Sequence, residues 1–250
     1  MARLGSLAEG TPLAPELVAP ASRWRLNAPL DLYSHWRGHG LATQAAAGRC
    51  LQLLEAPQPG RPRLRARLLE DGYLGWVELQ ALLGQARACG AHRPRLLDSA
   101  CIAAAIPAVL AFAEAAHARP NQYLWGGSLG PDYDCSGFLQ TAFASAGIWI
   151  PRDAYQQERF CQPVAIAPGC YSLLRSGDLI FFGPSRRCTH VGLHLGGGRY
   201  MHSSGRANGR DGLGIDGLDA HLLDPVSVHY RSELRGAGRV VRCHDGTTLP

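Results

Sequence analysis

The spacing of apolar and polar residues divides the chain into a strand-rich first third and a mixed remainder. Between residues 24 and 83, short alternating runs such as Arg63–Leu68 are separated by Gly, Pro and Asp-Gly turns. Period-two alternation of this kind is typical of half-buried antiparallel strands. The pattern therefore predicts a small β-barrel of five or six strands over residues 21–85.

The pattern changes after residues 86–98, a polar stretch that we interpret as a linker. The apolar run Ala100–Ala113 follows Asp98, an N-cap residue type, and predicts a helix that ends near Pro120. The run is shorter than a bilayer requires and contains Pro107. We interpret it as a buried helix and expect no membrane partner.

The remaining sequence predicts helices first and strands afterwards, an order typical of an α+β fold. Apolar residues at helical spacing follow Cys135. Three later runs predict strands: Asp178–Phe182, His190–Leu195 and Arg199–His202. The predicted organisation is an N-terminal tail over 1–20, the barrel, the linker, and a second domain over 99–245.

The composition excludes a disordered protein, because 46% of residues are apolar and 18% are charged. The net charge of +5 is carried entirely by arginine, and the arginines form no basic tract, so we expect no nucleic-acid partner. Arg63, Arg65 and Arg67 alternate along one predicted strand. We expect their face to be solvated, where charge discourages edge-to-edge pairing.

The first twenty residues lack the continuous apolar segment of a secretion signal, so the protein is expected to be cytoplasmic. The eight cysteines show neither a C-x-x-C pair nor a Cys/His spacing that we recognise as typical of zinc. We therefore expect them to be reduced and mostly buried, and we expect no metal.

Cys135 lies where a glycine-rich loop, residues 123–133, gives way to a predicted helix. Free backbone N–H groups and the positive end of the helix dipole should lower the pKa of its thiol. The thiolate is the nucleophilic form, and the same N–H groups can hold an oxyanion. The sequence thus predicts a nucleophilic cysteine at this helix start.

Two histidines can serve this cysteine, because His190 and His202 flank a hairpin turn at Gly196–Gly198. Both positions have the same parity, so their side chains share a face, either directly opposite or one diagonal step apart. We assign His190 as general base and acid and His202 as the residue that orients it. His194 has the same parity and is the alternative orienting residue.

Four sequence strings resemble the successive motifs of the NlpC/P60 cell-wall cysteine peptidases. They are Asp134–Phe138, Ser176–Phe182, His190–Leu193 and Tyr200–Ser203, in the family's order and spacing. The resemblance covers roughly residues 99–245. It implies a papain-like α+β fold and a catalytic triad of Cys135, His190 and His202, with no cofactor.

The N-terminal segment resembles the bacterial SH3 domain of cytoplasmic and cyanobacterial γ-D-glutamyl-L-diamino acid endopeptidases. The similar strings are Asn27–Tyr33, Thr43–Arg49 and Glu70–Val77. In that subgroup the barrel narrows the cleft, so that only a peptide with a free N-terminal L-alanine fits. The implied partner is a small murein peptide, cut between γ-D-glutamate and the diamino acid.

The same resemblance implies the residues that bind substrate. Tyr73 would contact the terminal amine and Asp134 would be its anionic partner, since a carboxylate pairs with an ammonium; alternatively, Asp134 caps the Cys135 helix. Ser136, Tyr123 and Trp125 would line the cleft, although the two aromatic residues fit wall packing equally well.

Two further assignments leave alternatives open. Glu70 or Asp71 could supply a second carboxylate for the amine, with Glu70 preferred. Arg152 either binds a substrate carboxylate or packs inside the domain. We therefore expect a cytoplasmic peptidase that recycles murein peptides. The alternatives are an exported hydrolase of intact wall, whose signal would lie upstream of the given start, and a non-catalytic murein-binding protein.

Overall fold

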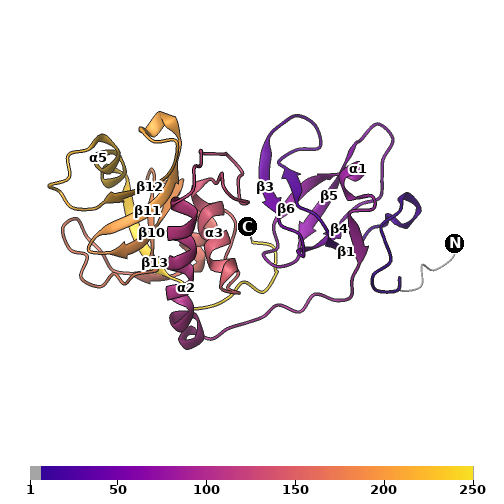
Figure 1. Cartoon of the computed structure of the whole chain (residues 1–250), viewed down its shortest axis with the longest axis horizontal. Helices are drawn as coiled ribbons and strands as arrows, with labels where there is room; N and C mark the ends of the chain where they lie inside the picture. The colour runs from indigo at the N-terminus through magenta and orange to yellow at the C-terminus, as the bar shows by residue number, and fades with distance from the viewer. Residues whose placement is uncertain (1–6, 250) are drawn as a thin grey trace. The chain divides into compact units, whose positions relative to one another are not determined.

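The computed structural model describes residues 7–249, which form two compact units (Figure 1). The first unit contains the described residues up to Pro94 together with Asp245–Leu249, and the second contains Arg95–His244. The chain therefore passes between the units twice. Each unit has its own buried apolar core.

The first unit is built on one antiparallel sheet with the strand order β3-β2-β6-β5-β4-β1-β7. Its strands are β1 (Arg23–Leu26), β2 (Leu30–Tyr33), β3 (Leu41–Ala45), β4 (Cys50–Leu53), β5 (Arg63–Leu68), β6 (Leu74–Glu78) and β7 (Ala86–Ala88). A short helix, α1 (Leu79–Leu82), follows β6. The alternating apolar residues fill the core, with Trp24, Leu32 and Leu51 completely buried, so the predicted strand pattern is confirmed.

Two predicted boundaries of this unit are wrong. Residues 86–88, assigned to the linker, form β7 and pair with β1, which gives the backbone of β1 a second hydrogen-bonded neighbour. Residues 7–20 are not a loose tail, since Leu13 and Val18 are buried in the core and the Leu13 N–H donates to the Ala86 carbonyl at 2.8 Å. The 3-10 helix η1 (Pro15–Leu17) lies in this segment. Residues 1–6 of the predicted tail are outside the described residues.

The prediction of a solvated arginine face on β5 is wrong for Arg63, whereas Arg65 and Arg67 are half-buried. Arg63 is buried, and its Nε donates to Glu78 Oε1 at 2.8 Å. Its Nη1 donates to the carbonyl oxygens of His35 and Gly38, and its guanidinium lies 3.4 Å from the centroid of the Tyr33 ring. The loop after β2 covers this charge, a long-range arrangement that alternation along β5 does not reveal.

The last described residues belong to the first unit and pack against its turn 69–73. Gly72 has φ +67°, and a Cβ there would lie 2.0 Å from the Thr247 carbonyl oxygen. Gly246 has φ +82°, and its Cβ would lie 2.2 Å from the Leu69 carbonyl oxygen. Both positions therefore require glycine, for conformation and for space.

The second unit contains an antiparallel sheet with the order β12-β11-β10-β9-β13-β8. Its strands are β8 (Gln162–Val164), β9 (Leu179–Phe182), β10 (His190–Gly196), β11 (Arg199–Ser204), β12 (Gly212–Gly217) and β13 (Leu234–Arg239). The helices are α2 (Ser99–His117), α3 (Cys135–Ser145), α4 (Ala154–Phe160) and α5 (Pro225–Ser232), with a 3-10 turn η2 (Arg206–Asn208). Helix α3 packs on β10 and β11, and α2 packs on α3 (Figure 1). The helices-then-strands prediction is confirmed.

Helix α2 is apolar but only partly buried, contrary to the prediction of a buried helix. Its 19 residues, with a mean hydropathy of 1.8, satisfy the length and composition of a membrane span, yet only 17% of that window is buried. Ile102, Val109 and Ala113 face the core, while the solvent-facing positions are largely alanine. The buried and exposed faces of the helix therefore differ in side-chain size rather than in polarity. Asp98 caps its start as predicted, accepting from the Cys101 N–H at 2.7 Å.

Candidate active site

Cys135 is the first residue of α3, as the sequence predicts, and a close backbone approach fixes this helix start. Asp134 is the N-cap, and its Oδ1 accepts from the Gly137 N–H at 2.7 Å. A Cβ on Gly137 would lie only 2.1 Å from the Gly127 carbonyl oxygen. Glycine at position 137 therefore allows the preceding loop to lie against the first turn of the helix.

Asp134 is held in a buried polar network with Arg152 and Ser136. Arg152 donates from Nη1 to Asp134 Oδ1 at 3.0 Å and from Nη2 to Oδ2 at 2.7 Å, a bidentate pair. It also donates to Ser136 Oγ at 3.0 Å. Arg152 is 1% exposed, so direct binding of a substrate carboxylate by this guanidinium is contradicted and the packing alternative holds. For Asp134, the capping alternative is confirmed.

The two predicted histidines meet on one face of the sheet. Leu193 pairs with Met201 across β10 and β11, so His190 and His202 are diagonal neighbours, as predicted for a Gly196–Gly198 turn. His190 Nε2 lies 2.7 Å from His202 Nδ1. His194 instead places Nδ1 2.9 Å from the Arg175 carbonyl oxygen, and this excludes it as the orienting residue.

A fourth polar side chain, Asp216 on β12, completes the array, and the sequence prediction missed it. Asp216 Oδ2 lies 2.6 Å from His202 Nε2 and also accepts from Arg210 Nε at 2.9 Å. The carboxylate only accepts, so it assigns the proton of His202 to Nε2. His202 Nδ1 then accepts from His190 Nε2–H, and His190 Nδ1 is left as a free base.

Aromatic side chains enclose these histidines. Tyr230 on α5 stacks on the His190 ring with centroids 4.3 Å apart, and its hydroxyl lies 2.6 Å from Ser204 Oγ. Phe182 and Tyr200 close other sides of the pair. The enclosure fixes the ring orientations and removes water.

One signal for Asp216 was available, since a carboxylate in a Gly-Ile-Asp-Gly string marks a polar position on a strand after the histidines.

The protonation of the site differs from the prediction of a lowered thiol pKa. Burial, followed by the nearby Asp134 carboxylate, raises the pKa of the Cys135 thiol to about 12, against hydrogen bonds from the backbone N–H groups of Val191 and Ser136. Burial also lowers the pKa of His190 well below its usual value, with His202 adding to this effect. At rest the Cys135 thiol and the His190 imidazole are therefore both neutral, because desolvation outweighs the helix end.

The predicted cleft aromatics occupy different environments in the second unit. Tyr123 is half-buried, and burial followed by the proximity of Cys135 and Asp134 raises its phenol pKa. Trp125 is 73% exposed within the described residues, which contradicts the wall-packing alternative for that ring. Tyr123 therefore lies close to Cys135, while Trp125 presents an open apolar surface.

The remaining predicted binding residues belong to the first unit. Tyr73 is half-buried and packs against that unit's core. Glu70 is buried, accepting from Arg49 Nε at 3.1 Å and from the Cys50 N–H at 2.6 Å. Asp71 Oδ2 pairs with Arg49 Nη2 at 2.9 Å. Both carboxylates pair with Arg49, and the assignment of Glu70 or Asp71 to the substrate amine stays a prediction.

Two protein-family models match parts of this chain. Residues 120–227 match the model of the NlpC/P60 family, and residues 32–82 match that of the bacterial dipeptidyl-peptidase SH3 domain. This chain contains an NlpC/P60 domain and an N-terminal bacterial SH3 domain. The NlpC/P60 match contains Cys135, His190, His202 and Asp216, and the SH3 match contains Tyr73.

The chain is similar over about a third of its length to bacterial peptidases. It is 40% identical over 84 residues to the γ-D-glutamyl-L-lysine dipeptidyl-peptidase of Bacillus subtilis, covering 32% of this chain and 27% of the relative. It is 36% identical over 84 residues to the murein DD-endopeptidase MepS/murein LD-carboxypeptidase of Escherichia coli K12, covering 33% and 42%. The matched segments thus span less than half of these relatives.

A solved NlpC/P60 family protein from Bacillus cereus is similar in structure, with a TM-score of 0.45 and 22% identity. The match covers 88% of this chain and 64% of that one.

Proposed function

We propose that this NlpC/P60 protein is a cysteine endopeptidase that cleaves the γ-D-glutamyl–diamino acid bond of murein peptides with a free N-terminal L-alanine. The observation that carries the proposal is the hydrogen-bonded array from His190 through His202 to Asp216, on strands against which α3 packs with Cys135 as its first residue. The name of the Bacillus subtilis relative supports the bond type. We place the activity in the cytoplasm, where it would recycle freed wall peptides.

The reaction begins from a protonated thiol. As the Cys135 sulfur attacks the γ-glutamyl carbonyl carbon, the thiol proton passes to His190 Nδ1, the basic atom of the array. His202, held by Asp216, accepts from His190 Nε2–H and stabilises the resulting imidazolium. Backbone N–H groups at the start of α3 hold the oxyanion of the tetrahedral intermediate.

Collapse of that intermediate breaks the carbon–nitrogen bond. The proton on His190 passes to the leaving amine of the diamino acid, and a thioester remains on Cys135. Water then gives a proton to His190 Nδ1 as its oxygen attacks the thioester carbon. The second intermediate releases L-Ala-γ-D-Glu and returns the proton to the sulfur, which restores the resting state.

Selectivity for a free amino terminus is the finer part of the proposal. Asp134 pairs with Arg152 and lies near Cys135, and its carboxylate would attract the substrate ammonium. Arg152 acts indirectly, as a positioning residue that holds Asp134 and Ser136. Tyr123 and Trp125 would line the cleft, and Tyr73 would contact the amine. We assign a small-barrel architecture to the SH3 domain and a papain-like fold to the catalytic domain.

The test is hydrolysis of L-Ala-γ-D-Glu-diaminopimelate by the purified chain, monitored by release of free diaminopimelate. We expect turnover by the wild type and by Cys101→Ser, and none by Cys135→Ala. The N-acetylated peptide should not be cleaved. Normal turnover by Cys135→Ala would overturn the mechanism, and equal cleavage of the acetylated peptide would overturn the assignment of the amine site.

A second candidate is hydrolysis of intact peptidoglycan, which is favoured by the similarity to a murein DD-endopeptidase. Incubation with purified sacculi separates the two activities, because a recycling enzyme leaves the sacculi intact and cleaves the free tripeptide. Solubilisation of sacculi at a comparable rate would favour the wall hydrolase, and cell fractionation would test the cytoplasmic assignment.

A further inference from the structure

The first unit contains a cluster of metal-ligand residue types that the proposed chemistry does not use. Cys50 is the first residue of β4, and Glu70 lies in the turn between β5 and β6. Cys89 and His92 follow β7 in an irregular segment. These four residues come from three separate parts of the sequence and meet within one unit.

The donor atoms of this cluster converge. The Cys50 sulfur, a Glu70 carboxylate oxygen and a His92 ring nitrogen all lie within 4.8 Å of one another. The Cys89 thiol is in hydrogen-bond contact with the Cys50 thiol. Donor atoms around one metal ion at bond lengths of about 2.0–2.3 Å are themselves roughly 3–4 Å apart, so small side-chain movements would suffice.

Neighbouring groups hold the cluster in place. The Leu69 N–H donates to the Cys50 carbonyl at 2.9 Å, which brings the turn beside β4. Glu70 is oriented by Arg49 and by the Cys50 N–H, in the way that outer partners orient a ligating carboxylate.

The chemistry of these donors selects the ion. Two thiolates, an imidazole and a carboxylate make four ligands, the number that Zn²⁺ takes in a structural site. Ca²⁺ and Mg²⁺ require mostly oxygen ligands, so sulfur donors disfavour them. Cys89 and His92 also form a Cys-x-x-His pair, a short spacing of the kind found in zinc sites. The prediction of no metal from the sequence did not take this pair into account.

We propose that Cys50, Cys89, His92 and Glu70 bind one Zn²⁺ ion in the SH3 domain. Cys50 is buried and His92 is half-buried, while Cys89 and Gly90 line a surface hollow through which an ion can enter. The ion joins the segment after β7 to β4 and to the turn 69–73 that carries Tyr73. The site is structural, since all four positions are filled by side chains.

The experiment measures metal content rather than peptidase activity, so it is independent of the proposed function. The full chain is reduced, stripped with a chelator, reconstituted with Zn²⁺ and analysed by plasma mass spectrometry. We expect about one zinc per chain, as for a closed structural site, and at least a tenfold loss of zinc in His92→Ala and Cys89→Ser.

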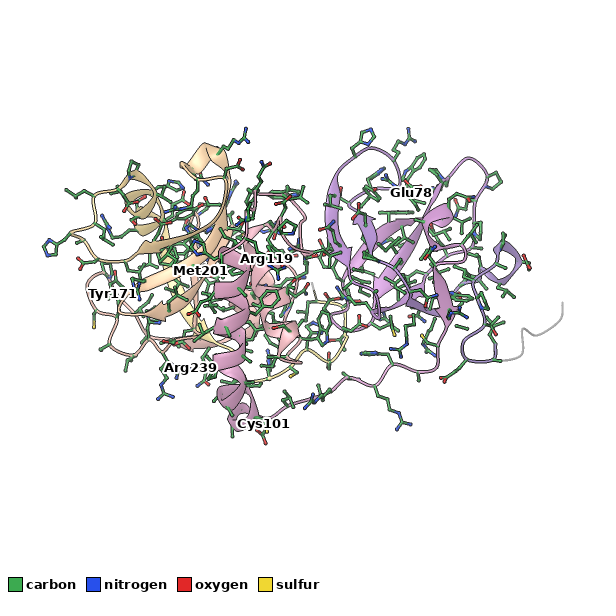
Figure 2. The ribbon with its side chains drawn as sticks, in the orientation of Figure 1. Glu78, Cys101, Arg119, Tyr171, Met201 and Arg239 are labelled. Carbon is green, nitrogen blue, oxygen red and sulfur yellow. The ribbon has the colours of Figure 1, made fainter. Side chains whose placement is uncertain are left out.

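Two variants serve as controls. Cys101→Ser removes an exposed thiol at the start of α2 (Figure 2), and Cys135→Ala removes the catalytic thiol; both should keep the zinc. Cobalt reconstitution should give a thiolate-to-metal charge-transfer band that disappears in Cys89→Ser, and zinc should raise the thermal midpoint of the wild type but not of His92→Ala.

Three results would overturn the proposal. They are a wild-type chain without zinc after reconstitution, zinc retained in a folded His92→Ala variant, and loss of zinc in Cys135→Ala, which would place the ion in the second unit. A Cys50–Cys89 disulfide found by mass spectrometry in the reduced, zinc-treated chain would overturn it as well.

Discussion

The two units each bring cysteine, histidine and a carboxylate together, but in different geometries. In the NlpC/P60 domain, His190, His202 and Asp216 form a line in which each group hydrogen-bonds to the next, at 2.7 Å and 2.6 Å. In the SH3 domain, the donors of Cys50, Glu70 and His92 surround a common point within 4.8 Å of one another. A line of groups passes or orients a proton, whereas convergent donors bind a cation. Residue type alone therefore does not distinguish a nucleophilic site from a metal site.

Among the variants that test this comparison, Cys135→Ala should have the largest effect on turnover. Removal of the sulfur removes the covalent step, so turnover of the tripeptide should fall on the order of 10⁵-fold or more. Rapid-quench assays of the purified variant measure this loss. The Cys50–Glu70–His92 cluster lies in the other unit, so the zinc content of this variant should not change. Residual turnover within tenfold of wild type would show that Cys135 is not the nucleophile.

The next effect is that of Asp216→Asn, which keeps the size of the side chain but lets it donate to His202. The reversed tautomer leaves His202 unable to accept from His190, and kcat should fall on the order of 10²–10⁴-fold. The exposed Asp219→Asn serves as the matched control, with kcat unchanged.

The pH profile separates an orienting role of Asp216 from a purely structural one. A variant that has only lost stability keeps the wild-type pH dependence of kcat/KM, whereas loss of the carboxylate changes it, because Asp216 raises the pKa of His202 against the effect of burial. An unchanged profile together with unchanged kcat would remove Asp216 from the array.

A third effect concerns the free energy of unfolding. It tests whether the buried Arg152–Asp134 pair stabilises the domain that contains the His190–His202–Asp216 array. Arg152→Met leaves Asp134 buried without its bidentate partner, which should cost about 3–5 kcal/mol of unfolding free energy. Arg159→Met, on the exposed side of α4, should cost less than about 0.5 kcal/mol. Urea unfolding of both variants, followed by far-ultraviolet circular dichroism, measures the difference. Equal stabilities would mean that the Arg152–Asp134 pair contributes little.

The smallest effect is the position of the acid limb in the pH profile of kcat/KM. Burial lowers the pKa of His190 well below its usual value of 6.5, so the imidazole remains a base until the pH falls far below 6.5. Activity should therefore be lost only as the pH falls through that lowered pKa. Since burial raises the pKa of Cys135 to about 12, no activating limb should appear near pH 8 to 9. A half-maximal rate at or above pH 6.5 would contradict the neutral resting pair.

Several site features followed directly from local rules. Asp98 and Asp134 were each recognisable as possible caps, because a helix start depends on a few adjacent residues. His190 and His202 were paired by parity across a glycine turn, since side chains alternate along every strand. The family resemblance on the same residues is confirmed by the NlpC/P60 and SH3 matches.

Other features depended on contacts between distant segments. Arg63 was assigned to solvent and Arg152 was left between substrate binding and packing. Both are buried, because a separate loop encloses Arg63 and a distant carboxylate pairs with Arg152. The raised pKa of Cys135 has the same origin, since the depth of the sulfur depends on how α3 packs against the sheet. A sequence reading of the helix end alone predicts the opposite shift.

The sequence by itself determined the strands before residue 84, the starts of the helices at Ser99 and Cys135, and the histidine pair, because these depend on spacing within one element or one hairpin. Only the tertiary structure decided which carboxylate orients His202, where Asp134 and Arg152 pair, and how Cys50, Glu70 and His92 converge. The physical reason is the separation in sequence over which each interaction acts. Local geometry repeats every two or 3.6 residues, whereas desolvation and charge pairing depend on segments that only the folded chain brings together.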